Sequence, residues 1–251
     1  MNWPQRILIV WVAAILATGA SAADLNVFAA ASLSEALAQV GADYGRATGD
    51  HVRFNFGGSG ALALQIKLGA PADVIVSADE LRVDQLEKAG LIIPGTRRAI
   101  LANQLVVIVP AAENSPVVSP ADLEGAGIRR IAIRQPDLVP AGAYAREYLE
   151  RLGLWEGVRR RLVPLDNVRA VMEAVGSGDV EAGFVYRTDA LFSGRVRVAI
   201  SVPLADGPRI TYPVAVIRST REPGAAKSFA AFLSGAEAQA VFAKFGFLQP
   251  N

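Results

Sequence analysis

The stretch with the clearest potential for chemistry is a serine set among glycines, Gly57-Gly-Ser-Gly60, which follows a short aromatic strand. Glycine lets the backbone bend and lets a ligand approach it closely. The residues that follow are largely apolar, so Ser59 lies where a helix is expected to begin. The first backbone N–H groups of a helix have no partner within it, and the helix dipole favours negative charge there. This arrangement predicts an anion-binding turn.

Other interpretations of the same stretch remain open at this point. Ser59 could be an ordinary helix cap, because serine is common at that position. Gly58-x-Gly60-x-x-Ala63, with Asp79 about twenty residues further on, also fits a dinucleotide-binding fingerprint. A hydrolase is disfavoured, because G-x-S-x-G fails at its last position and the only histidine, His51, starts a strand. A Walker motif is excluded, because no Lys-Ser/Thr pair follows the glycines.

A second hydroxyl follows the first predicted strand, residues 25–30. Ser32 and Glu35 have the S-x-x-E spacing of a capping box, and apolar residues follow at helical intervals. A hydroxyl has one donor and two acceptor sites. Ser32 is therefore expected to cap its helix and still donate a hydrogen bond to a ligand.

Strands and helices alternate along the chain, which predicts an α/β architecture with parallel sheets. In such sheets ligands bind beyond the carboxyl ends of the strands, where the chain turns into a helix. Four residues are expected at such turns: Ser32, Ser59, Ala141 and Val168. Their repetition predicts a site ringed by backbone N–H groups. The sequence shows no metal-ligand cluster, so no metal or other cofactor is expected.

The first 22 residues have the pattern of a secretory signal peptide. Arg6 precedes an uncharged apolar run that is too short to span a membrane, and Ala20-Ser-Ala22 fits a cleavage site. The chain has no cysteine, so neither disulfides nor a lipid anchor are expected. We predict a periplasmic protein cleaved near Ala22. With 25 basic and 24 acidic residues, the chain is not expected to bind nucleic acid.

Seven segments in a fixed order carry a family resemblance over nearly the whole mature chain. They are FAAASLSEAL from Phe28, GGSGALALQIKLGAPADVIVSAD from Gly57, VPAGAYAREYLERLGLW from Val139, DNVRAVMEAV from Asp166, GFVYRTDA from Gly183, YPVAV from Tyr212 and FAKFGF from Phe242. Together they resemble the periplasmic molybdate-binding proteins of ABC importers.

The resemblance implies the two-lobed periplasmic solute-binding fold of type II. Each lobe would be a mainly parallel sheet flanked by helices, and two crossover strands would join the lobes. Residues 105–110 would lead out and residues 212–217 would lead back. Lobe I would then comprise residues 23–104 and 213–251, and lobe II residues 105–212.

The resemblance also implies a ligand set for a tetrahedral dianion that is held by neutral hydrogen-bond donors. Ser32 and Ser59 would serve on lobe I, through hydroxyl and backbone N–H. On lobe II the donors would be the backbone N–H groups of Ala141 and Val168 and the hydroxyl of Tyr186. Tyr186 rests mainly on the resemblance, because a tyrosine at a strand end is commonly structural.

The implied function is binding of molybdate or tungstate in the cleft between the lobes, without enzymatic activity. The implied partners are a membrane permease and its ATPase subunits, and the protein would be a monomer. Protonated phosphate is disfavoured, because the ring lacks an acceptor for its O–H and burying that group unpaired costs about 1–3 kcal/mol. Two alternatives stay open: another tetrahedral oxyanion such as sulfate, and a periplasmic nucleotide-binding or oxidoreductase domain.

One departure from the family pattern concerns charge. Arg134-Gln135 stands where a small residue and an acid are expected before V-P-A-G. Arginine at a strand end is usually solvated, so Arg134 is expected outside the anion's contact shell, where it would act on the association rate. An inward-facing Arg134 would instead add a cation beside the pocket.

Overall fold

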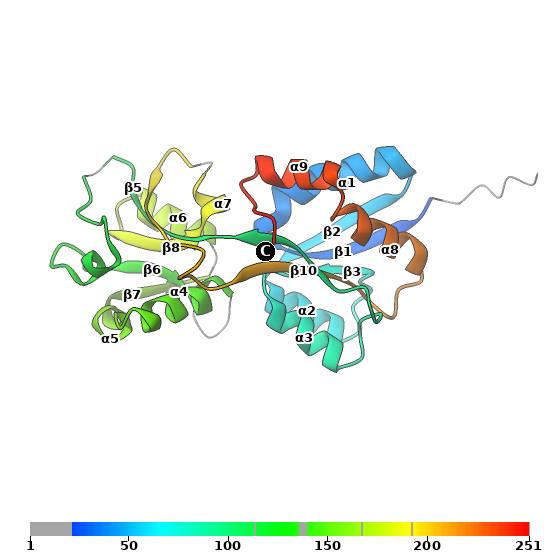
Figure 1. Ribbon diagram of the computed structural model, residues 1–251, viewed down its shortest axis with the longest axis horizontal. Coiled ribbons are helices and arrows are strands. Elements are labelled where there is room, and N and C mark those ends of the chain that lie inside the picture. The colour runs from blue at the N-terminus through cyan, green and yellow to red at the C-terminus, as the bar shows by residue number, and fades with distance from the viewer. Residues whose placement is uncertain (1–21, 113, 136–139, 167, 192, 251) are drawn as a thin grey trace, which may run out of the picture.

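The computed structural model describes residues 22–112, 114–135, 140–166, 168–191 and 193–250. It consists of two lobes, each built around a five-stranded sheet (Figure 1). This architecture confirms the predicted two-lobed α/β fold. The predicted signal peptide lies outside the described residues except for its last position.

Lobe I combines strands from both ends of the chain in the order β2-β1-β3-β10-β4. These strands are β1 (Asp24–Ala30), β2 (His51–Gly57), β3 (Val74–Val76), β4 (Arg98–Asn103) and β10 (Ile210–Val216). The helical segments of this lobe are η1 (Ala31–Leu33), α1 (Ser34–Thr48), α2 (Ser59–Lys67), α3 (Glu80–Lys88), α8 (Pro223–Phe232) and α9 (Ala236–Lys244). Helices α1, α8 and α9 cover one face of the sheet, and α2 and α3 cover the other (Figure 1).

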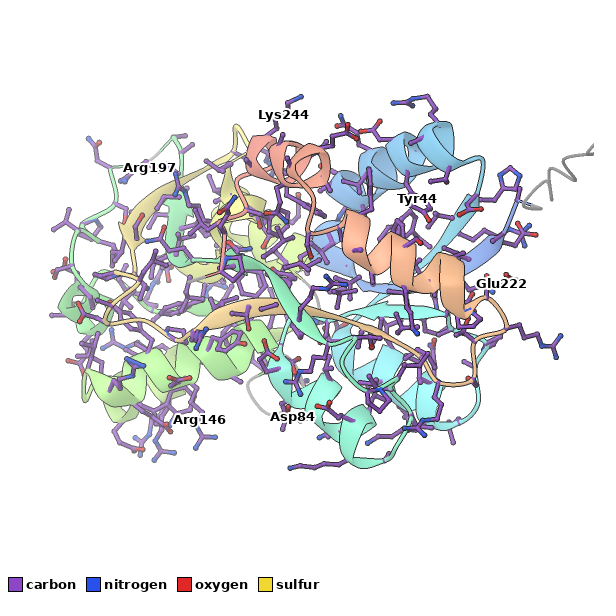
Figure 2. All side chains as sticks on the ribbon, turned by 45° about the vertical axis from the view of Figure 1, so that its right-hand side comes forward. Tyr44, Asp84, Arg146, Arg197, Glu222 and Lys244 are labelled. Carbon is purple, nitrogen blue, oxygen red and sulfur yellow. The ribbon has the colours of Figure 1, made fainter. Side chains whose placement is uncertain are left out.

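Both faces of the lobe I sheet are apolar because both are covered by helices. Along β1, Val27 packs into the same core as Tyr44 of α1, and Phe28 packs into a second core with Leu62 of α2. Tyr44 meets Phe229 of α8 edge-on, with ring centroids 5.1 Å apart (Figure 2). Burial on both faces explains why the inner strands β3 and β10 are almost continuously hydrophobic in the sequence.

Lobe II repeats the arrangement in the order β7-β6-β8-β5-β9. Its strands are β5 (Leu105–Pro110), β6 (Ile131–Arg134), β7 (Leu162–Leu165), β8 (Ala182–Tyr186) and β9 (Val196–Ser201). Its helical segments are η2 (Pro120–Glu124), α4 (Pro140–Arg151), α5 (Trp155–Val158), η3 (Arg159–Arg161), α6 (Val168–Gly176) and α7 (Arg187–Ala190). All six residues of β5 are buried, which accounts for its β-branched run.

Each sheet contains one strand that runs against the other four. In lobe I, β10 pairs antiparallel with both β3 and β4, while β1 pairs parallel with β2 and β3. In lobe II, β5 pairs antiparallel with β8 and β9, while β6 pairs parallel with β7 and β8. The carboxyl ends of the parallel strands therefore share one edge in each sheet, which is the edge where ligands bind in α/β folds.

The chain passes between the sheets in two places. A single residue, Gln104, separates β4 from β5, and the return runs from β9 to β10. The β-branched run at residues 103–110 predicts one buried strand there and none directly before it. This prediction is correct for β5 and wrong for β4, which it does not include. The predicted return boundary at residues 212/213 falls within β10, whose first residue, Ile210, already pairs with Asn103 of lobe I.

Candidate anion-binding cleft

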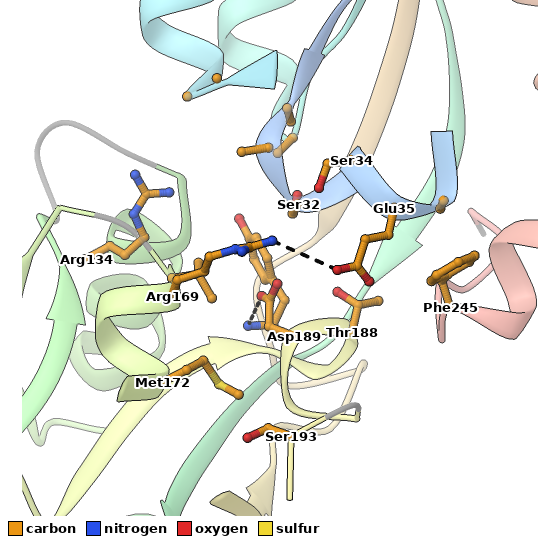
Figure 3. A pocket seen from close by; sticks show the side chains of 18 of the residues that line it. Ser32, Ser34, Glu35, Arg134, Arg169, Met172, Thr188, Asp189, Ser193 and Phe245 are labelled. Atoms are coloured by element: carbon orange, nitrogen blue, oxygen red, sulfur yellow. Dashed lines mark hydrogen bonds and ion pairs between the residues drawn. The ribbon is translucent and has the colours of Figure 1, made fainter. Parts of the chain in front are cut away.

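A cleft of about 820 Å³ is lined by residues from both lobes (Figure 3). Four residues of the predicted ligand set line it: Ser32 and Ser59 from lobe I, and Val168 and Tyr186 from lobe II. Ala141 is buried in the first turn of α4 and is not among the lining residues. The preceding loop, residues 136–139, lies outside the described residues.

The two lobe I serines are neighbours because of the register between β1 and β2. Ala30, at the end of β1, pairs with Gly57, at the end of β2. Ser32 and Ser59 each follow two residues later, so two strand-to-helix turns lie side by side at the cleft. Glycine at position 57 allows the two turns to approach in this way, because a side chain there would press on Leu62 of α2.

Ser59 is the first residue of α2 and is 2% exposed. Its Oγ accepts a hydrogen bond from the backbone N–H of Ala78 at 3.0 Å. It does not cap the helix, because the cap position is Gly58 and no side chain bonds there. With one acceptor site used by Ala78, the hydroxyl proton can be donated to a ligand.

The expected capping box at Ser32 is wrong. A 3-10 turn, η1, follows β1 directly, so Ser32 lies inside that turn and α1 begins only at Ser34. The cap position of α1 is Leu33, which has no side-chain cap. The Ser32 Oγ lies instead 3.3 Å from the hydroxyl of Tyr212.

Tyr212 connects Ser32 to a buried polar chain at the base of the cleft. The Asn103 Nδ2 donates to the Tyr212 hydroxyl at 3.1 Å and to the Thr188 Oγ1 at 3.0 Å. Thr188 belongs to lobe II and lines the cleft, so the chain joins the two lobes. None of the three was predicted at the site, because they are far apart in the chain and meet only when the two lobes are assembled.

Two predicted lobe II residues come from the ends of β7 and β8, which lie on either side of β6. Val168 begins α6 just after β7, and Tyr186 ends β8. Burial, followed by the nearby Tyr212, raises the pKa of Tyr186 well above its ordinary value. The Tyr186 hydroxyl therefore remains protonated and can act as a neutral hydrogen-bond donor.

The cleft also contains charged side chains that are outside the predicted ligand set. Its lining includes Arg134, Arg169 and Asp189, and burial raises the pKa of Asp189 to about 7. Asp189 Oδ2 accepts a hydrogen bond from the backbone N–H of Tyr186 at 3.2 Å. The cleft therefore contains a carboxyl that can accept a hydrogen bond from the O–H of protonated phosphate. The expectation that no such acceptor is present is wrong.

Arg134 was expected to be solvated, and this prediction is wrong. It is half-buried, lines the cleft, and donates from Nη2 to the backbone carbonyl of Asp166 at 3.0 Å. Arg169 is by contrast largely exposed, and its Nη2 reaches across the cleft to Glu35 Oε1 at 3.9 Å (Figure 3). An exposed pair at that distance contributes little to stability.

Within the described part of the chain, no group of three or more histidines, cysteines or carboxylates is placed to hold a metal ion. The described residues also contain no helix long and apolar enough to cross a membrane. The lining of the cleft includes hydroxyls, three arginines, four carboxylates and several apolar side chains. Its hydroxyls, its arginines and the N–H groups at helix starts are donors suited to an anion.

Residues 25–248 match the family model described as "Bacterial extracellular solute-binding protein". The chain belongs to this family. The glycines that suggested a dinucleotide fingerprint follow β2, an edge strand of the lobe I sheet. The family match spans both lobes and the cleft between them.

Individual members of the family are also similar to this solute-binding protein. The molybdate-binding protein ModA of Escherichia coli (strain K12) is 34% identical over 230 residues, which cover 89% of this chain and 88% of that protein. ModA of Haemophilus influenzae is 33% identical over 232 residues, 91% of each chain. The solved structure of the periplasmic molybdate-binding protein of Azotobacter vinelandii has a TM-score of 0.78 and 27% identity, and covers 90% of this chain and 100% of that one.

Proposed function

We propose that this solute-binding protein is the molybdate-binding component of an ABC importer. The observation that carries the proposal is the meeting of Ser32 and Ser59 with Val168 and Tyr186 in one cleft between two lobes. The similarity to molybdate-binding proteins supports molybdate as the anion. Ala141 completes the proposed ligand set through its backbone N–H at the start of α4.

The proposed site binds through neutral donors, which avoids burying several fixed charges before the ligand arrives. Tungstate has the same charge and nearly the same size as molybdate, so we propose that it binds as well. Sulfate remains the second candidate, because it is also a fully deprotonated tetrahedral dianion and only cavity size would reject it. No cofactor takes part in this function, and we assign no catalytic role to any residue.

The remaining parts of the proposal concern location and partners. The proposed protein is exported by its signal peptide, acts as a periplasmic monomer, and delivers the anion to a membrane permease with ATPase subunits. The expected division was residues 23–104 and 213–251 for lobe I and residues 105–212 for lobe II. We propose it with the return boundary moved to Ile210, because all of β10 pairs within the lobe I sheet. Ligand that contacts both lobes favours the closed form by its differential affinity.

Calorimetric titration of ligand-free protein with molybdate, tungstate, sulfate and phosphate tests this function. The expected result is saturable binding of molybdate and tungstate with one site per chain, and much weaker binding of the other two anions. Tight binding of sulfate with weak binding of molybdate would reassign the solute. Absence of binding to all four anions, in protein shown to be folded, would overturn the proposal.

A further inference from the structure

Arg134 is a charged group of the cleft whose hydrogen bonding is incomplete. Its Nη2 is held by the backbone carbonyl of Asp166, but its Nε is buried and has no hydrogen-bond partner. A buried donor without a partner is costly, and more so when it carries charge. The cost is removed when the side chain of Arg134 turns its Nε toward an acceptor in the cleft that this residue lines.

The position of Arg134 is fixed by both lobe II turns that belong to the proposed site. At the end of β6 it pairs with Leu165 of β7, directly before Asp166 and the turn that leads to Val168. On its other side, the backbone carbonyl of Arg134 packs so closely on Gly142 of α4 that no side chain would fit there. The backbone of Arg134 therefore lies between the turns that carry the proposed N–H donors of Ala141 and Val168, and its Nη2 bonds to the second of these turns at Asp166.

Arg134 differs from the other arginines of the cleft in its electrostatic partners. Arg195 pairs with Glu173 at 2.8 Å, and Arg169 faces Glu35 at 3.9 Å. Among the described residues, no carboxylate lies within ion-pair distance of Arg134. Burial is the largest influence on the pKa of its guanidinium group and lowers it, while the nearby Tyr186, Asp189 and Asp166 act in the opposite direction.

We propose that Arg134 binds the anion directly through its Nε–H, and that its charge makes the cleft select doubly charged tetrahedral oxyanions over singly charged ones. The proposal rests on the proposed function and adds a cation to a site otherwise made of neutral donors. Attraction to one fixed charge doubles when the ligand charge doubles, and water in a partly buried cleft screens it less than at the surface. Arg134 is therefore a specificity-determining residue for the solute.

The test compares Arg134→Gln with Arg169→Gln, a matched change at the exposed arginine of the same cleft. Each variant is titrated with molybdate, and perrhenate, a tetrahedral anion of similar size and single charge, is measured by competition. Titrations are run at about 0.05 M and about 0.5 M salt, because exposed charges are screened at the higher value. Circular dichroism of the ligand-free variants establishes that they are folded.

We expect Arg134→Gln to weaken molybdate binding about ten- to a hundred-fold at both salt concentrations, the range for a lost charged hydrogen bond. Perrhenate should lose much less, so that discrimination between the two anions falls. Arg169→Gln should change molybdate affinity less than about threefold, and only at low salt. Arg134→Lys keeps the charge but lacks Nε–H, so it should keep the discrimination and still bind molybdate more weakly than the wild type.

Three results would overturn the inference while the wild type binds molybdate. The first is an unchanged molybdate affinity in both Arg134 variants. The second is a loss that disappears at high salt, which would assign Arg134 to long-range steering. The third is an equal loss of molybdate and perrhenate affinity, which would mean that Arg134 only positions the turn before Val168. A wild type that binds no oxyanion would instead refute the proposed function.

Discussion

Replacing Ser59 by alanine removes two interactions of one buried hydroxyl. The Oγ accepts from the backbone N–H of Ala78 at 3.0 Å, and the side chain is 2% exposed. In the proposed site the same hydroxyl donates its proton to the anion. Ser59→Ala should therefore affect both the stability of the free protein and its affinity for molybdate, and the two effects can be measured separately.

The expected losses of affinity and stability depend on which hydrogen-bond partner loses the Ser59 hydroxyl. Loss of a hydrogen bond to a charged ligand costs about 1.5–3 kcal/mol, which corresponds to about ten- to a hundred-fold weaker binding. Loss of the acceptor leaves the Ala78 N–H buried without a partner, which costs about 1–3 kcal/mol of unfolding free energy. Calorimetry at a temperature well below unfolding gives the first value, and urea unfolding of ligand-free protein gives the second.

Ser34→Ala is the matched control for this substitution. Ser34 lines the same cleft and begins α1, but it is outside the proposed ligand set. We expect its molybdate affinity to stay within about threefold of the wild type, since no charged hydrogen bond is lost. Wild-type affinity in Ser59→Ala would refute the lobe I half of the site, and a loss in Ser34→Ala as large as in Ser59→Ala would require a different ligand set.

Three further outcomes are expected. Tyr212→Phe should lower the unfolding free energy by about 1–3 kcal/mol, because the Asn103 amide loses a buried acceptor. It should weaken molybdate binding less than Ser59→Ala does, because it releases Ser32 without removing a proposed ligand. Unchanged stability in urea would contradict this prediction. Molybdate affinity should fall between pH 6 and pH 8, because Asp189 ionises near its raised pKa of about 7 and then repels the dianion, and titrations of Asp189→Asn should lack this dependence. Molybdate at a hundred times its dissociation constant should stabilise the protein by about 2.7 kcal/mol, so an unchanged melting temperature would argue against binding.

Asp189 has a second consequence, for stability in the absence of ligand. Its pKa is raised from the ordinary value of 3.8 to about 7, so between these values the folded protein holds a proton that the unfolded chain has released. The unfolding free energy should therefore fall as pH rises from about 4 to about 7. Asp189→Asn should remove this slope in urea unfolding, and a slope that persists would assign it to other groups.

Local sequence patterns predicted an element correctly where all the residues that determine it lie in one segment. The β-branched run of β5 predicted a buried strand, and the glycines around Ser59 predicted the turn that opens α2. Both serines were predicted at strand-to-helix turns of one site, and the observed register of β1 and β2 is what brings Ser32 and Ser59 together. Strand β4 was missed because a single residue, Gln104, separates it from β5, and the two read as one strand.

The errors at the site come from tertiary structure. The Ser32 cap failed because η1 moves the cap position of α1 by one residue, from Ser32 to Leu33, and the S-x-x-E spacing gives no sign of that shift. Arg134 was expected in solvent, but pairing of β6 with β7 places it beside the Asp166 carbonyl. The Asn103–Tyr212 contact joins residues 109 positions apart, so only the assembled lobes reveal it.

Binding of molybdate between the two lobes is tested by a crystal structure of the mature protein grown with molybdate. The molybdenum is located by its anomalous scattering. We predict one strong anomalous peak in the cleft, with oxygens in hydrogen-bond distance of Ser32 and Ser59 on one lobe and of Val168 and Tyr186 on the other. A peak that contacts only one lobe, or a peak elsewhere with an empty cleft, would contradict the account.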